Sequence, residues 1–257
     1  MGKDKQWWTG VPTTLLRKEV MVPRSDHSLP VYTLTFRIPE YDTEAFTGAA
    51  IHHSKLRLDL GDVVKMVIPN YKPKSYSISA LRDDEFDITI KVYPNGRASG
   101  PLDRLKIGDS INSFGKSVSR RRNPGKYVGI ICFGVGITEG IPVARAELKA
   151  GMFVKLLWAS RTASDTFWKD EIQALHEEFP DKFELVNIFS REEREGSLHG
   201  RINPDVLKTV FQPASAEDAR FLSVGTKEMM RQTEEMLMSI GYSLPHNLLL
   251  PKIKDLA

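Results

Sequence analysis

The spacing of apolar residues changes near residue 125 of this 257-residue chain, and that change limits the folds open to it. Before it, short segments alternate apolar and polar residues, at 13–22, 31–38, 62–68, 75–79, 86–93 and 110–114. Such alternation is typical of strands with one buried face. After it, Tyr127 to Phe133 is a continuous apolar run, typical of a parallel strand buried on both faces. We therefore expect two domains of different class.

The first domain is expected over residues 10–118. Six short strands with one small helix, at 101–105, predict a closed or nearly closed antiparallel six-stranded β-barrel. Residues 40–55 lack a clean period and carry His52-His53, so we expect a surface insertion there. The segment 116–126 contains Arg120-Arg121-Arg122 and then Asn123-Pro124-Gly125, which is typical of a linker.

The second domain is expected over residues 126–257. Apolar strands are predicted at 127–133, 153–159, 183–189 and 221–224, and helices at 139–149, 165–179, 204–211 and 227–240. This alternation predicts an α/β doubly wound parallel sheet of the Rossmann-like kind. Ligands of such sheets bind at the carboxyl ends of the strands.

Composition excludes several classes of protein. A net charge of +3 is too small to indicate nucleic-acid binding, and the single cysteine, Cys132, excludes internal disulfides. Adjacent histidines on a strand would point to opposite faces, so no metal site is expected. No apolar run is long enough for a membrane span, which favours a soluble, cytoplasmic protein. Trp7-Trp8 could instead attach it peripherally to a membrane, although docking of these rings on the protein body is favoured.

Three motifs of the first domain indicate a site for a flat, phosphorylated cofactor. They are Lys74-Ser75-Tyr76-Ser77, Ile90-Lys91-Val92-Tyr93 and Gly96-Arg97-Ala98-Ser99. Lys74 can neutralise a phosphate, and strand alternation places Tyr76 and Ser77 on opposite faces. Gly96 lets the backbone approach an anion, and Ser99 begins a short helix whose free N–H groups favour negative charge.

A glycine turn follows the first apolar strand of the second domain. It reads Gly134-Val135-Gly136-Ile137-Thr138, and it leads into a predicted helix that can receive a pyrophosphate. A lone Gly-x-Gly is weak evidence, since such glycines are often simple strand-to-helix turns. No Lys-Ser/Thr pair follows, which disfavours a nucleoside-triphosphate P-loop.

The first-domain motifs are similar to the flavin site of the ferredoxin-NADP reductase superfamily, especially its cytochrome b5 reductase and nitrate reductase branch. The family's Arg-x-Tyr-Ser/Thr, Ile-Lys-Val-Tyr and Gly-x-x-Ser appear in the same order, with Lys74 in place of the arginine. The resemblance implies FAD, with FMN less favoured, and Ser77 as the catalytic residue at the reactive ring edge. The flavin-binding residues that it implies are Lys74, Tyr76, Ser77, Lys91, Tyr93, Gly96, Arg97, Ala98 and Ser99.

The same resemblance implies an NAD(P)H site in the second domain. Its residues would be Gly134, Gly136, Thr138, Arg161, Gly225 and Met229. Three residues depart from the family's motifs: Val135 and Glu139 in the glycine turn, and Val224 where a cysteine is usual. Arg161 could meet a 2′-phosphate, or Asp165 nearby could simply cap its helix. The choice between NADH and NADPH stays open.

The function implied is a flavin-dependent oxidoreductase that passes electrons from NAD(P)H through FAD to a haem or iron-sulfur protein. Arg120-Arg121-Arg122 could dock such a partner if it is acidic, although a solvated linker is the favoured interpretation. The main alternative is a flavin-binding or regulatory module with a degenerate nicotinamide site. A third is an interaction protein that holds no flavin.

Overall fold

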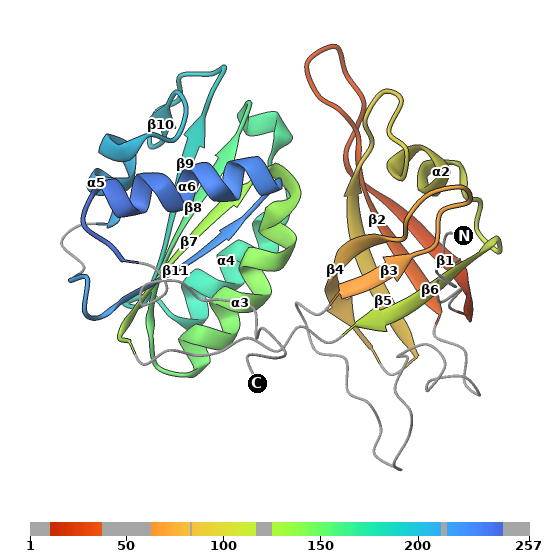
Figure 1. Ribbon diagram of the computed structural model, residues 1–257, viewed down its shortest axis with the longest axis horizontal. Coiled ribbons are helices and arrows are strands. Elements are labelled where there is room, and N and C mark those ends of the chain that lie inside the picture. Colours follow the sequence, from red (N-terminus) through yellow and green to blue (C-terminus); the bar gives the residue numbers. More distant parts are fainter. Residues whose placement is uncertain (1–10, 38–62, 83, 117–124, 212–214, 244–257) are drawn as a thin grey trace, which may run out of the picture. The chain divides into compact units, whose positions relative to one another are not determined.

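The computed structural model describes residues 11–37, 63–82, 84–116, 125–211 and 215–243. It divides into two compact units (Figure 1). The first comprises Met1–Val20 with Pro30–Ser117, and the second Met21–Leu29 with Val118–Ala257. The predictions for Trp7-Trp8, for the 40–55 insertion with His52-His53 and for Arg120-Arg121-Arg122 concern segments outside the described residues. The bounds 10–118 and 126–257 stay a prediction.

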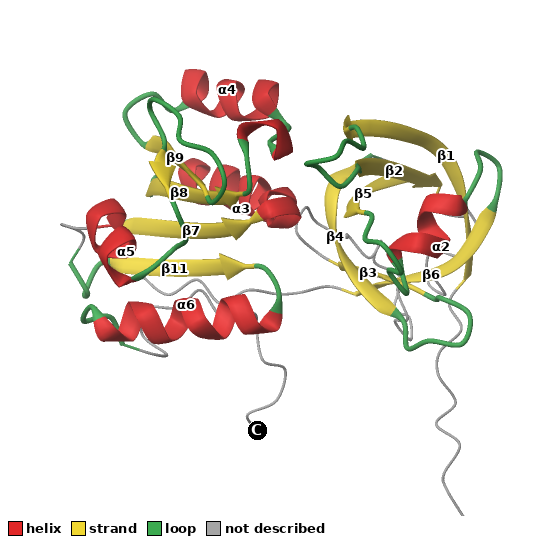
Figure 2. Cartoon of the chain, turned by 90° about the horizontal axis from the view of Figure 1, so that it is seen from above, coloured by secondary structure: helices red, strands yellow, loops and turns green. Residues whose placement is uncertain are grey.

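The first unit is a closed barrel with the strand order β1-β2-β5-β4-β3-β6, which confirms the predicted architecture. Its elements are β1 (Val11–Val22), β2 (Val31–Arg37), β3 (Val63–Met66), β4 (Lys74–Leu81), β5 (Glu85–Lys91), α2 (Ser99–Arg104) and β6 (Ser110–Lys116). The strand pairs β1–β6, β2–β5, β3–β4, β3–β6 and β4–β5 are all antiparallel. Figure 2 looks into the barrel, and α2 lies at one of its ends.

Apolar side chains at alternate positions of the strands fill the interior of the barrel. Leu34, Ile78 and Ile88 are fully buried, each flanked by residues on the outer face, and Phe36 and Phe86 stack inside with ring centroids 5.5 Å apart. This cluster also takes in Leu102 of α2. The barrel core is therefore a single apolar cluster to which the short helix is attached.

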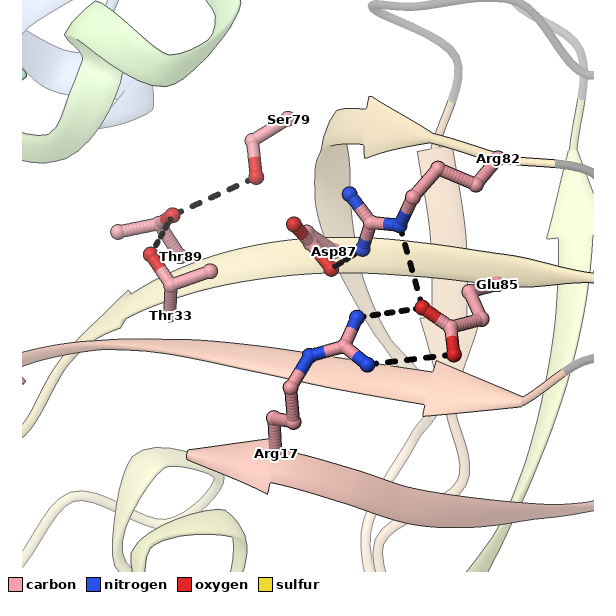
Figure 3. A network of polar contacts seen from close by, with 7 residues as sticks. All are labelled: Arg17, Thr33, Ser79, Arg82, Glu85, Asp87 and Thr89. Carbon is pink, nitrogen blue, oxygen red and sulfur yellow. Dashed lines mark hydrogen bonds and ion pairs between the residues drawn. The ribbon is translucent and has the colours of Figure 1, made fainter. Parts of the chain in front are cut away.

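Charged side chains form a network on the outer face of the barrel (Figure 3). Glu85 accepts hydrogen bonds from Arg17 and Arg82, and Arg82 also pairs with Asp87. The Arg17 guanidinium, followed by Arg82, lowers the pKa of the Glu85 carboxyl below its usual range. These pairs join β1, β5 and Arg82, the residue that follows β4, across the exposed surface.

Replacing Glu85 with glutamine is expected to lower the melting temperature at pH 7. A lowered carboxyl pKa stabilises the fold above the ordinary value of about 4.3, and that stabilisation is lost as the pH falls through the folded-state pKa. The difference between Glu85→Gln and wild type should therefore be constant near neutrality and vanish in acid. Thermal melts across pH check this, with the exposed Glu19→Gln as control. A difference that persists below the folded-state pKa would contradict it.

The second unit is a five-stranded parallel sheet with the order β10-β9-β8-β7-β11, which confirms the predicted class. Its strands are β7 (Tyr127–Phe133), β8 (Phe153–Ser160), β9 (Phe183–Phe189), β10 (Leu198–His199) and β11 (Ala219–Val224). Its helices are α3 (Ile137–Lys149), α4 (Lys169–Glu178), α5 (Pro204–Phe211) and α6 (Lys227–Ser239), with short 3₁₀ turns η1 (Gly134–Gly136) and η2 (Ala163–Asp165).

Helices cover both faces of this sheet. Ile131, Leu157 and Ile188 pack in one cluster with residues of α5 and α6. On the other face, the side chains of Ile130, Cys132 and Leu156 lie against Gly140 of α3. Cys132 is fully buried there, as predicted for a core residue.

The structure corrects two expectations. The helix predicted from Asp165 to Phe179 begins only at Lys169, because η2 occupies Ala163–Asp165 and Trp168 has a left-handed backbone with φ 58°. Phe179 is the residue after its end. The two-residue strand β10 was not predicted, since a segment this short carries no periodic signal. Among the described residues, we find no helix with the length and apolarity that crossing a membrane requires.

Candidate cofactor sites

The predicted flavin residues gather where β4 begins and β5 ends. Antiparallel pairing of these strands brings Lys74, at the start of β4, to the loop that follows Lys91, at the end of β5. Lys74 is exposed, whereas Tyr76 is partly buried against the barrel core. Burial raises the pKa of the Tyr76 phenol to about 12, so the hydroxyl stays protonated and can donate a hydrogen bond.

Ser77 lies on the opposite face of β4 from Tyr76. Tyr76 is paired with the buried Val64, and Ser77 with Val63, whose side chain is only half-buried. Ser77 itself is half-buried on the outer face of the barrel. Tyr76 and Ser77 therefore lie on opposite faces of β4, as strand alternation predicts, and the Ser77 side chain is on the outer face near the start of this strand.

The loop from Tyr93 to Ser99 is closed by its own hydrogen bonds. The Gly96 N–H donates to Tyr93 O at 3.0 Å, and the Tyr93 N–H donates to Ser99 Oγ at 3.2 Å. A Cβ on Gly96 would lie 2.1 Å from Ser99 Oγ, so the loop has no room for a side chain there. Ser99 is buried, and Ala98 stands half-buried at the N-cap of α2.

This loop carries Tyr93 and Arg97, and the Tyr71 ring lies beside Arg97. The Arg97 guanidinium lies over the Tyr71 ring at 5.8 Å, and Tyr71 and Tyr93 are about half exposed. Tyr71 was missed by the sequence analysis; the only signal was its place after the turn at Pro69-Asn70. Exposed rings, two cations and a tight backbone turn are the donor set that a planar, phosphorylated cofactor requires. The residues present therefore fit FAD.

In the second unit, the glycine turn needs glycine at both Gly134 and Gly136, as the backbone conformation and the surrounding atoms show. Gly134 has φ +54°, a left-handed conformation, and its carbonyl accepts a hydrogen bond from Trp158 Nε1 at 2.8 Å. A Cβ on Gly136 would lie 2.5 Å from Val224 O. The Thr138 hydroxyl donates to Val135 O at 2.9 Å, inside the turn. Trp158 was not predicted as part of this site.

Gly225 and Met229 meet the glycine turn at the same edge of the sheet. β11 pairs with β7 in parallel, with Val224 opposite Cys132, so both strands deliver their following loops to this edge. Gly225 packs against Phe133, Thr226 caps α6 by accepting the Met229 N–H, and Met229 is 40% exposed. Gly134, Gly136 and Gly225 thus lie at one edge of the sheet, with Met229 in the first turn of α6, and their role in binding a nucleotide stays a prediction.

Arg161 follows β8 at this edge and is held by Asp165. Its Nη2 lies 3.2 Å from Asp165 Oδ1, and Thr162 donates to Asp165 Oδ2 at 3.3 Å. Asp165 is only 5% exposed and does not cap α4, because Trp168 is the N-cap residue of that helix. The interpretation of Asp165 as a cap is therefore wrong: its carboxylate positions the Arg161 side chain.

The NAD(P) site can be tested for fit at the same edge. The hydroxyl oxygens of Ser160, the last residue of β8, and Ser223, near the end of β11, are buried without a hydrogen-bond partner in the described part of the chain. Together with the glycine turn, such groups suit a polar ligand at the carboxyl ends of the strands. A cavity of about 320 Å³, lined by Tyr127, Phe153 and Phe183, lies at the opposite, amino-terminal ends. It plays no part in the predicted sites.

Two family models match the two halves of the chain. The oxidoreductase FAD-binding domain matches residues 40–118, and the oxidoreductase NAD-binding domain matches residues 130–235. The NADH–cytochrome b5 reductase 1 of Arabidopsis thaliana is 29% identical over 179 residues, 66% of this chain. That of Emericella nidulans is 27% identical over 236 residues, 87% of this chain and 74% of the relative. The chain combines an oxidoreductase FAD-binding domain with an oxidoreductase NAD-binding domain and is similar to NADH–cytochrome b5 reductases.

These matches confirm the predicted resemblance and the pairing of FAD with a nicotinamide nucleotide. The chain spans 63% of the Arabidopsis relative and 62% of the corresponding protein of Mycosarcoma maydis. The fold is also that of the cytochrome b5 reductase domain of Ulva prolifera nitrate reductase, with a TM-score of 0.71 and 18% identity over 92% of this chain and 95% of that one. A Neisseria gonorrhoeae ferredoxin NADP+ reductase gives 0.68 and 18%, covering 95% and 96%.

Proposed function

We propose that this protein is a flavin-dependent oxidoreductase of the ferredoxin-NADP reductase kind, which passes electrons from NAD(P)H through FAD to a one-electron acceptor, a haem or iron-sulfur protein. The observation that carries the proposal is the closed Tyr93–Ser99 loop, which carries the exposed Tyr93 ring and an Arg97 guanidinium that lies over the exposed Tyr71 ring. The relatives are named as NADH–cytochrome b5 reductases, which supports a haem protein as the acceptor.

The bound flavin would supply the redox chemistry, accepting a hydride and releasing electrons singly. The residues of the chain bind and orient it. Lys74, Arg97 and the backbone of Gly96 to Ser99 would hold the diphosphate, and Tyr76, Lys91 and Tyr93 would line the flavin. Ser77 would donate a hydrogen bond to the reactive edge of the ring, which makes it the candidate catalytic residue.

The nicotinamide dinucleotide would bind along the edge formed by the glycine turn, Arg161, Gly225 and Met229. Thr138 would act by holding Val135 O, because its hydroxyl donates inside the turn. Arg161 would meet the adenosine end while Asp165 orients it. The domain bounds 10–118 and 126–257, an acidic acceptor, and a soluble or peripherally membrane-associated protein belong to the same proposal.

A second candidate is a flavin-binding module with little nicotinamide chemistry. It is favoured by Val135, Glu139 and Val224, which replace residues that the family uses at the nucleotide edge. It is also favoured by the Arg161–Asp165 pair, which occupies a cation otherwise available to the nucleotide.

Anaerobic addition of NADH and of NADPH to the FAD-loaded protein separates the two candidates. For the reductase, we expect the flavin absorbance to bleach with at least one of the nucleotides, because hydride transfer removes the oxidised chromophore. Dithionite, which reduces flavin without a nucleotide site, is the control. A spectrum that dithionite bleaches but neither nucleotide changes would contradict the reductase and support the module.

A further inference from the structure

The indole ring of Trp158 is buried next to the glycine turn and is hydrogen-bonded to it. Trp158 lies in β8, opposite Cys132 of β7, and is 1% exposed. Its Nε1–H donates to Gly134 O at 2.8 Å. A buried indole N–H ordinarily finds a partner. A phenylalanine ring would fill much of the same space without a donor, so the hydrogen bond is what tryptophan adds at this position.

This hydrogen bond fixes the peptide group that joins Gly134 to Val135. Gly134 O also accepts the N–H of Ile137, the first residue of α3, so two donors from different elements hold one carbonyl. A trans peptide group is planar, and its C=O and N–H point in opposite directions. Because the carbonyl is directed at the indole, the Val135 N–H points away from it. Backbone N–H groups held in one direction at a strand-to-helix turn are suited to bind a phosphate.

The backbone of Gly134 makes the direction of this peptide group depend on outside support. Gly134 has a left-handed conformation, with φ +54°. Glycine reaches many other conformations without steric cost, so the residue itself does not select this one. The donors on its carbonyl do so instead, and the one that comes from outside the turn and its helix is Trp158 Nε1.

The same ring supports the segment that carries Arg161. Phe167 packs edge-to-face on Trp158, with ring centroids 5.7 Å apart, and is 5% exposed. It follows two residues after Asp165, whose carboxylate binds Arg161. Trp158 therefore contacts the glycine turn through its N–H and the Arg161 segment through its ring.

We propose that Trp158 is a positioning residue for the nicotinamide nucleotide. Its N–H keeps the Val135 N–H in one orientation for the pyrophosphate, and its ring holds the Arg161 segment in place beside the turn. The inference rests on the proposed function, since it takes the glycine turn as part of the nucleotide site. A site held in its binding conformation loses less freedom when the ligand arrives, and so binds it more tightly. Loss of the indole N–H should therefore weaken nucleotide binding and leave hydride transfer unchanged.

The test separates nucleotide binding from hydride transfer. The FAD-loaded protein is reduced anaerobically over a range of NADH and of NADPH concentrations, and the rate of flavin bleaching is followed by stopped flow. In Trp158→Phe, the nucleotide concentration that gives half the limiting rate is expected to rise about 3- to 10-fold, the effect of one hydrogen bond. The limiting rate should stay near that of wild type. Damage to the core alone would lower stability without this split between the two constants.

Trp168→Phe is the matched control. Trp168 packs on Phe167 with ring centroids 6.0 Å apart, and within the described residues its indole N–H donates to no other group. The same substitution there should leave the half-saturating concentration at the wild-type value.

A second variant at position 158 isolates the donor from the shape of the ring. Benzothienylalanine, which has sulfur in place of the indole N–H, should raise the half-saturating concentration as Trp158→Phe does. A wild-type concentration in either variant at position 158, or an equal rise in Trp168→Phe, overturns the inference while the proposed function stands. If Trp158→Phe does not fold, the benzothienylalanine protein decides alone. A wild-type protein whose flavin is reduced by neither nucleotide overturns both.

Discussion

Replacing Gly96 with alanine is expected to reduce the affinity for FAD roughly 10- to 100-fold while the barrel stays folded. The new Cβ would lie 2.1 Å from Ser99 Oγ and 3.0 Å from Tyr93 O, the two atoms that close the loop. Forcing a methyl group into such a contact costs about 1–3 kcal/mol, and each 1.4 kcal/mol is a tenfold change in affinity. Titration of the apoprotein with FAD, followed by fluorescence, measures the change.

Gly100→Ala is the matched control for this prediction. It stands four residues along the same segment, in α2, and a Cβ there would meet only Arg104 Nη1 at 3.5 Å, an ordinary contact with the end of a flexible side chain. Its affinity for FAD should stay within a few-fold of wild type. If the two alanine variants bind FAD equally well, the Tyr93–Ser99 loop does not hold the cofactor.

Replacing Gly136 with alanine is expected to slow reduction by NAD(P)H roughly 10- to 100-fold at low nucleotide concentration, with FAD still bound. The added Cβ would lie 2.5 Å from Val224 O and 3.1 Å from Val224 C, which are backbone atoms of β11 and cannot rotate aside. The strain, again about 1–3 kcal/mol, pushes the glycine turn away from β11, the strand that leads into Gly225. Anaerobic stopped-flow reduction across nucleotide concentrations measures it.

Val135→Thr is the control in the same turn. It keeps the side-chain volume at a half-buried position and restores the hydroxyl that the family carries there, so its reduction rate should equal or exceed that of wild type. An unchanged rate in Gly136→Ala, with the turn displaced, would show that this edge of the sheet does not bind the nucleotide.

The fold could be predicted because both domains depend on local periodicity. Alternation in segments such as Val31–Arg37 marks strands with one buried face, and the unbroken apolar run of β7 marks a strand covered on both sides. The start of α4 could not be predicted this way. It is set by the left-handed backbone at Trp168, whose ring packs edge-to-face on Phe167, and no pattern of polarity encodes that conformation.

The sites were predicted as motifs, but the contacts that shape them are long-range. Trp158 reaches Gly134 O from a residue 24 positions away, and Arg97 meets the Tyr71 ring from a separate loop. Asp165 was assigned to its own helix because local rules favour a cap, whereas its carboxylate binds Arg161. The Ser79 hydroxyl likewise lies 3.4 Å from that of Thr89 at a shift in strand pairing between Ile78 and Ala80, which the alternation of polarity did not predict.

The central claim is that the barrel binds FAD through the segment from Lys74 to Ser99. It is tested most directly by titrating the purified apoprotein with FAD and recording the visible spectrum and the flavin fluorescence at each addition. The account predicts saturable binding of one FAD per chain, with a shifted flavin spectrum and altered fluorescence. A titration in which the added FAD keeps the spectrum and fluorescence of free flavin throughout would contradict it.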